Sequence, residues 1–241
     1  MFDMPVALIE VNGKVLIAPM IRPDMKIPAV HCTILFVLLL AAGCKSSPPS
    51  ERMPEGEARF ERLNQDGTRY TGTGDFGRQP WACVRDRVTG LVWEVKQGDG
   101  GLHDADHTYT WYDPDPRRNK GAEGKRDGGQ CRGSACDTLA FIEAVNAAGW
   151  CGFNDWRLPD QAEIASINDR HRRYPGPTQD PAFFPNARAD QYWTSETHLY
   201  YPGAWAWNFA YGHNQVDWKT NAKRVRLVRG EVKTRLARPE D

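Results

Sequence analysis

The sequence predicts an α+β domain that is rich in loops, with two helices among short and mostly antiparallel strands, and that is held together by disulfides. Three observations lead to this prediction. All nine tryptophans lie beyond residue 80, and the chain has 22 glycines, 17 prolines and no long apolar run in this part, which is typical of a loop-rich fold with an aromatic core. Only two segments carry the caps of longer helices. Beyond residue 80 there are also four cysteines, an even number that suits two disulfides.

Short strands separated by turns are expected on both sides of the helices. Turn signals stand at Asp66-Gly67 and Thr89-Gly90 before the helices, and at Pro202-Gly203 and 212–214 after them. The long polar segment 96–129 is interpreted as a loop interrupted by one strand-like stretch. The expected strands are 60–63, 68–70, 81–86, 91–95, 108–112, 192–195, 204–209, 215–218 and 224–228.

Two segments have the start and stop signals of helices. Asp137 can cap a helix whose apolar positions fall on one face, and Gly149 stands where this helix should end. Asp160 and Glu163 are three residues apart and form the capping box of a second helix. We expect the second helix to stop near Asn168.

The four cysteines Cys83, Cys131, Cys136 and Cys151 predict two disulfides in a chain that leaves the reducing cytosol. Three pairings are possible. We favour Cys131 with Cys136, which would close a short Arg-Gly-Ser-Ala loop, and Cys83 with Cys151, which would tie a strand to the end of a helix. Zinc and redox sites are disfavoured because the spacing lacks C-x-x-C pairs.

Residues 34–44, Ile-Leu-Phe-Val-Leu-Leu-Leu-Ala-Ala-Gly-Cys, are typical of the apolar core and cleavage box of a bacterial lipoprotein signal. The apolar run is shorter than the about 20 residues that a membrane-spanning helix needs. Cleavage before Cys44 would leave a lipidated cysteine at the N-terminus of the mature protein. Ala41 stands three places before this cysteine, where the usual box has leucine.

We therefore divide the chain into an extension, a signal peptide, a disordered tether, a domain and a basic C-terminal tail. The signal peptide would begin at Met25, so that the residues before it are interpreted as an over-extended start of translation. The alternative for them is a pair of strands that turns at Asn12-Gly13. The tether is rich in serine, proline and charge. In chain order the five parts are residues 1–24, 25–43, 44–57, 58–230 and 231–241.

Several motifs together resemble one family. The most specific is Asp155-Trp-Arg-Leu-Pro159, and the others are 83–95, 109–112, 136–138, 144–146, 192–195 and 225–229. They are similar to the domain at the C-terminus of Legionella collagen-like adhesins, which also occurs in many bacterial lipoproteins, and the similarity covers residues 60–230. The resemblance implies a C-type-lectin-like fold, shared in outline with sulfatase-modifying enzymes, and, from the adhesins, binding of sulfated polysaccharide. It offers no catalytic residue to carry over.

The sequence has no recognisable catalytic or metal-binding motif. Asn154-Asp155-Trp156 lacks the partner triplet of a calcium-dependent sugar site, so we interpret it as structural. Asp99, Asp104 and Asp106 could hold calcium with loop carbonyls, but solvated loop carboxylates are the interpretation that we favour. Ser195 lacks a Gly-x-Ser-x-Gly elbow. We therefore expect no cofactor, no metal and no enzymatic activity.

Charge is uneven along the chain although the formal net charge is zero, so the total gives no argument for nucleic acid. Between Lys219 and Arg238 there are eight bases and one acid, Glu231. Such a patch suits a polyanion, whether sulfated glycan, lipopolysaccharide phosphate or anionic lipid; a solvated tail and face are the alternative. The candidate ligand residues, with a second cluster, are Lys219, Lys223, Arg224, Lys233, Arg235, Arg238, Arg170, Arg172 and Arg173.

Aromatic residues could either fill the core or stack on sugar rings. Trp205 and Trp207 alternate along an expected strand with Phe209, and we interpret their shared face as buried. Aromatic residues in loop-like contexts are better ligand candidates. These are Trp111, Tyr112, Tyr200 and Tyr201.

These observations predict a non-enzymatic binding protein of the bacterial cell envelope, bound to the membrane through its lipid anchor. We place it in the outer membrane because Lys45 differs from the aspartate that retains lipoproteins at the inner membrane. The expected ligand is a sulfated or phosphorylated polysaccharide. The alternatives are an envelope structural or assembly protein that binds another protein and, more remotely, an enzyme of the sulfatase-modifying-factor-like fold. The oligomeric state stays open.

The lipoprotein interpretation predicts the mass of the mature protein. Protein extracted from membranes should begin at Cys44 and carry a diacylated or triacylated cysteine, and Cys44→Ser should leave the precursor uncleaved. Intact-mass spectrometry of the extracted protein checks both expectations. A soluble product that retains residues 1–43 would contradict them.

Overall fold

The structure is a computed structural model that describes residues 6–11, 14–19, 55–199 and 202–233. The expected signal peptide, Cys44 and most of the tether therefore lie outside the described residues. The chain divides into two units, 1–51 and 52–241. In the first unit β1 (Val6–Val11) pairs antiparallel with β2 (Lys14–Pro19). This is the strand pair named above as the alternative, and its turn residues lie outside the described part.

An antiparallel sheet of four strands opens the second unit. In sheet order its strands are β11 (Val228–Arg229), β5 (Val92–Glu94), β4 (Cys83–Asp86) and β3 (Phe60–Leu63). The hairpin expected between 60–63 and 68–70 is present in a short form: Leu63 and Arg69 form an antiparallel bridge, and the N–H of Tyr70 donates to the carbonyl of Arg62 at 2.9 Å. Along its whole length β3 also pairs with β4. Asp66 accepts hydrogen bonds from both the backbone and the hydroxyl of Thr68 in the turn.

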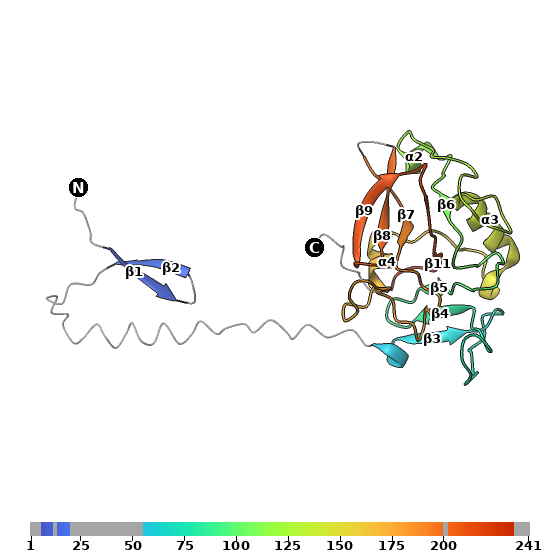
Figure 1. Cartoon of the computed structure of the whole chain (residues 1–241), viewed down its shortest axis with the longest axis horizontal. Coiled ribbons are helices and arrows are strands. Elements are labelled where there is room, and N and C mark those ends of the chain that lie inside the picture. The colour runs from blue at the N-terminus through green and yellow to red at the C-terminus, as the bar shows by residue number, and fades with distance from the viewer. Residues whose placement is uncertain (1–5, 12–13, 20–54, 200–201, 234–241) are drawn as a thin grey trace. The chain divides into compact units, whose positions relative to one another are not determined.

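A second antiparallel sheet contains β7 (Gln191–Thr197), β8 (Gly203–Asn208) and β9 (His213–Trp218), in this order (Figure 1). A short pair joins β6 (Tyr109–Thr110) to β10 (Ala222–Lys223). The single strand expected over 224–228 is wrong, because the chain there leaves β10 and crosses to β11, which belongs to the four-stranded sheet.

Three α-helices lie in the described part of the second unit: α2 (Pro116–Asn119), α3 (Thr138–Ala148) and α4 (Gln161–Ser166). Two 3₁₀ turns, η1 (Gly56–Ala58) and η2 (Trp150–Gly152), accompany them. The two predicted helices are confirmed with their caps: Asp137 accepts the N–H of Ala140 at 2.9 Å, and the capping box of Asp160 is complete. The helix α2 was not expected from the sequence, although Asp115-Pro116 is a cap followed by a proline at the first helical position.

Two aromatic clusters form the core. One includes Phe141 of α3, Trp156 and Trp193, and the other surrounds Ile164 of α4 with Trp93 and other aromatic residues. In Figure 1, α3 lies at the right of the second unit and α4 lies near the lower ends of β7 and β8. Each helix therefore covers its own cluster.

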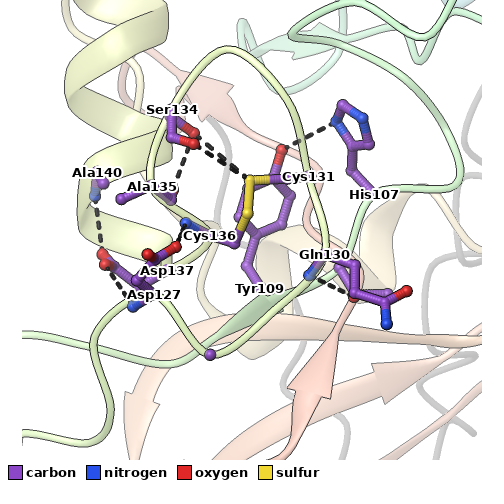
Figure 2. Close-up of a disulfide and its surroundings, with 12 residues drawn as sticks. His107, Tyr109, Asp127, Gln130, Cys131, Ser134, Ala135, Cys136, Asp137 and Ala140 are labelled. Carbon is purple, nitrogen blue, oxygen red and sulfur yellow. Dashed lines mark hydrogen bonds between the residues drawn. A yellow bond between two sulfur atoms is a disulfide. The ribbon is translucent and has the colours of Figure 1, made fainter.

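The structure contains both disulfides, in the pairing that the sequence favours. Cys83–Cys151 joins β4 to η2 inside the core, over a separation of 68 residues. Cys131–Cys136 closes the loop before α3, over a separation of five. Figure 2 shows how this loop is fastened to the start of α3: Asp127 accepts the N–H of Cys136 at 2.7 Å and donates its own N–H to Asp137 at 3.1 Å.

A buried carboxylate, that of Glu94, connects several parts of the domain. One of its oxygens accepts from Lys96 Nζ at 2.8 Å and lies 2.9 Å from His103 Nδ1, and the other accepts the N–H of Leu227 at 2.9 Å. Burial alone would raise the pKa of this carboxyl, but the charge of Lys96 and the hydrogen bond to His103 hold it at about 2. The ionised carboxylate is thus the favoured form inside the core.

The two disulfides should contribute unequally to stability. In the chain-entropy model the longer loop makes Cys83–Cys151 worth about 4 kcal/mol and the short loop makes Cys131–Cys136 worth about 2 kcal/mol. Urea unfolding of the two double Cys→Ala variants checks this order. Equal losses in the free energy of unfolding would contradict it.

Replacing the buried carboxylate by Glu94→Gln should cost about 3–5 kcal/mol at neutral pH, because Lys96 and Arg226 stay buried without it. The folded-state pKa lies below the ordinary value of 4.5, so the stabilisation is present above pH 4.5 and is lost as the pH falls towards 2. The difference in unfolding free energy between wild type and Glu94→Gln should therefore become smaller in acid. Urea unfolding across this pH range checks the prediction, with substitution of an exposed carboxylate, Glu143→Gln, as the control. A difference in unfolding free energy that is independent of pH would contradict it.

Candidate functional site

Lys219 was predicted to bind ligand, and this prediction is wrong because the residue is fully buried. Its Nζ donates to the carbonyls of Asn119 and Ala122, at 2.9 and 2.6 Å, and lies 4.0 Å from the centre of the Trp111 ring. Desolvation lowers the pKa of the ammonium to about 8. Lys219 therefore binds carbonyl groups at and just after the C-terminal end of α2 from inside the domain.

Lys223 and Arg224 are also used inside the domain. The ammonium of Lys223 is 6% exposed, donates to Asp217 at 2.5 Å and also contacts Gln191. The guanidinium of Arg224 is 16% exposed, donates to Asp190 at 2.9 Å and reaches the carbonyl of Ala105. Both positive charges are matched by carboxylates, so neither residue fits the predicted role in binding a polyanion.

Two of the aromatic ligand candidates belong to the core. Trp111 is 1% exposed and its Nε1 donates to the carbonyl of Thr194 at 3.0 Å. Tyr112 is 8% exposed, and its backbone exchanges hydrogen bonds with the hydroxyl of Thr138. Their position in a long polar segment was misleading, because both residues follow β6 directly and are hydrogen-bonded inside the domain. The other candidates Tyr200, Tyr201, Arg235 and Arg238 lie outside the described residues.

The second basic cluster, in contrast, lies at the surface. Arg170, Arg172 and Arg173 are all exposed. Within the part of the chain that the structure describes, no carboxylate lies within ion-pair distance of their guanidinium groups; the side chain of Arg172 donates instead to the carbonyl of Pro177 at 3.1 Å. Most exposed arginines elsewhere in the domain have acidic partners, as Arg118 has in Asp113. These three arginines are therefore available to an external anion.

A network of hydrogen bonds fastens this segment to the turn between β8 and β9. Thr178 donates its N–H to the carbonyl of Phe209 at 2.8 Å, and its hydroxyl donates to Asn168 Oδ1 at 2.6 Å. Asp169 donates its N–H back to the carbonyl of Thr178 at 2.6 Å. The loop between Asn168 and Thr178 is thus closed at its base, and its arginines are presented at a fixed edge of the domain.

Two tyrosines complete the surface beside the arginines. The rings of Tyr174 and Tyr211 stack with their centroids 4.7 Å apart and 13° between their planes, although the residues are 64% and 58% exposed. The proximity of Tyr174 raises the pKa of Tyr211. His213 follows, with its ring 5.8 Å from that of Tyr211. We call Arg170, Arg172, Arg173, Tyr174 and Tyr211 the arginine–tyrosine patch.

The arginines of this patch were expected from the sequence, but the two tyrosines were not. Tyr174 directly follows Arg173, so its position beside the basic cluster could have been noticed. Tyr211 is 37 positions further along the chain, in the turn that ends at Gly212. Only the hydrogen bonds between the two loops bring it to the cluster.

The carboxylates of the acidic loop make contacts within the domain. Asp104 accepts the N–H groups of Gly100 and Asp106, at 2.7 and 2.8 Å, and is 9% exposed, so the expectation of a solvated carboxylate is wrong for it. Asp106 accepts hydrogen bonds from Nε and Nη2 of Arg188, at 2.8 and 3.0 Å. Among the residues that the structure describes, no group of three or more His, Cys, Asp or Glu side chains is placed to hold a metal. No helix in this same part is long and apolar enough to span a membrane.

Comparison with known proteins gives one match. The model of a family described as the Lcl C-terminal domain matches residues 82–229, a range that contains the whole arginine–tyrosine patch and ends before the basic tail. No curated protein and no solved structure matches the chain significantly.

Proposed function

The chain belongs to the Lcl C-terminal domain family, and from this premise we propose that it is a lipid-anchored binding protein of the bacterial cell envelope that recognises a sulfated or phosphorylated polysaccharide without chemical turnover. The arginine–tyrosine patch is the proposed binding surface. The proposed fold is C-type-lectin-like, in keeping with its few helices, antiparallel sheets and two disulfides.

The observation that carries the proposal is the presence of three exposed arginines without acidic partners next to two exposed, stacked tyrosines. Guanidinium groups pair with the oxygens of sulfate and phosphate through parallel hydrogen bonds. Aromatic rings offer an apolar surface to the carbon faces of sugars. A sulfated sugar uses both properties, whereas an inorganic polyphosphate or a lipid phosphate uses only the first.

The anchor and the tail support this proposal from the sequence. Lipidation at Cys44 and the tether over 44–57 would hold the domain at the membrane surface, in our proposal the outer membrane. Lys233 is exposed, and Arg235 and Arg238 follow it in the tail, so they would extend the positive charge available to a long polymer. The backbone N–H of Lys233 donates to the carbonyl of Thr89 at 2.8 Å.

The same patch also favours a second candidate, an envelope assembly protein that binds another protein. Tyrosine and arginine are the residues most enriched at the energetic centres of protein interfaces. Tyr174 and Tyr211 would then form an apolar centre and the arginines its charged rim. This candidate predicts tight binding to one protein partner and no retention on a sulfated polymer.

The polyanion proposal predicts salt-sensitive retention of the purified protein on immobilised heparin, because surface charges are screened over about 8 Å at physiological ionic strength. Replacing Arg170, Arg172 and Arg173 by serine should lower the salt concentration of elution markedly. A charge-matched control, Arg78, Lys125 and Arg132 replaced by serine, removes three exposed bases elsewhere and should change elution little.

The outcomes separate the alternatives. Equal losses of retention in the two triple variants would mean that only the total charge matters. If the wild-type protein is not retained even at low salt, the candidate function of binding another protein is favoured. Truncation after Gly230 measures how much of the retention on heparin depends on the tail. If only the truncation weakens retention, the tail and not the patch is the binding element.

A further inference from the structure

A groove of about 600 Å³ opens between α2, α4 and the strands β7 and β8. It contains Trp205 at the start of β8 and the residues that end β7, whereas Tyr211 lies in the turn that follows β8. The groove and the arginine–tyrosine patch therefore lie at opposite ends of β8. The residues that line it are Arg117, Arg118, Lys120, Gln161, Ser195, Glu196, Thr197, Leu199 and Trp205.

The charges in and around this groove cancel. Arg117 donates to Asp115 at 2.9 Å, and Arg118 donates to Asp113 at 2.6 Å, so both guanidinium groups have carboxylate partners. The remaining cation among the lining residues is Lys120, and its charge is balanced in number by the carboxylate of Glu196. A polyanion therefore gains no net attraction from this groove, in contrast to the arginine–tyrosine patch.

One wall of the groove offers an aromatic surface. Trp205 is only half-buried, while Ala204 and Ala206 on either side of it are fully buried. The expectation that Trp205 shares the buried face of Trp207 is thus wrong in part: Trp207 is 5% exposed, but the indole of Trp205 reaches the groove. The ring of His198 packs at 61° to this indole, 5.8 Å away, and supports it from one side.

Polar side chains of β7 that line the groove are suited to hydroxyl ligands. Glu196 Oε2 accepts the N–H of Gln161 at 3.1 Å, which orients the carboxylate and leaves its other oxygen able to accept. Ser195, next to it, is exposed and lines the groove as well. A ligand rich in hydroxyl groups would satisfy these acceptors and donors.

We propose that this groove is a second binding site, and that it takes an uncharged pyranose of a glycan chain. The carbon face of the ring packs on the Trp205 indole, and its hydroxyl groups bind Glu196 and Ser195. A neutral ring matches the cancelled charges and uses the aromatic wall together with these polar groups. The site is independent of the polyanion proposal, because it shares no residue with the arginine–tyrosine patch.

The test is saturation-transfer NMR of the purified protein with uncharged oligosaccharides of glucose, of mannose and of N-acetylglucosamine, each at low and at high salt. At least one should bind saturably, with an affinity that salt changes less than about twofold, since no net charge is involved. Trp205→Ala should weaken this binding by about tenfold or more. Trp218→Ala, which removes a 51% exposed indole outside the groove, should leave it unchanged.

A second variant separates loss of binding from loss of folding. Glu196→Gln keeps an acceptor for the N–H of Gln161 but changes the group that binds the sugar, so it should weaken binding while the unfolding free energy stays constant. The triple variant of Arg170, Arg172 and Arg173 should bind the neutral sugar as the wild type does. The proposal is overturned if no uncharged oligosaccharide binds, if binding is lost at high salt, or if Trp205→Ala has no effect.

Discussion

The hydrogen bonds of the buried Glu94 carboxylate are the interaction on which the rest of the domain depends. They join β5 to the loop that carries Lys96 and His103, and to the backbone of Leu227 just before β11. His103 in turn stacks on Trp150 with ring centres 3.7 Å apart, next to the disulfide at Cys151. One carboxylate thus organises a loop-rich chain that has little regular secondary structure to do so. Its long loops can then carry binding surfaces at fixed positions.

The charged residues fall into two groups with different physical roles. Lys219, Lys223 and Arg226 are buried, and their charges or donors are used by carbonyls and carboxylates of the domain itself. Arg170, Arg172 and Arg173 are exposed and lack acidic partners in the described part of the chain, so their charges stay available to an external ligand. A basic stretch of sequence therefore says little about a binding surface until the partners of each base are known.

Features that depend on residues close in sequence were predicted well, whereas features that depend on contacts between distant residues were not. The caps of α3 and α4 and the two disulfides follow from residues close in sequence or from the chemistry of cysteine. The burial of Lys219 could not be predicted, because the carbonyls that bind it belong to Asn119 and Ala122, far along the chain. The stacked tyrosines and the groove likewise arise only when loop 168–178, α2 and α4 are placed beside the sheet of β7, β8 and β9.

In our proposal the ligand contacts the arginine–tyrosine patch, and an NMR titration of the isotope-labelled protein with a sulfated oligosaccharide tests this contact. We expect saturable shifts of the backbone amides in 168–178 and 209–213, and little change in the groove around Trp205. Shifts confined to the residues beyond Gly230, or spread evenly over all exposed bases, would contradict the claim.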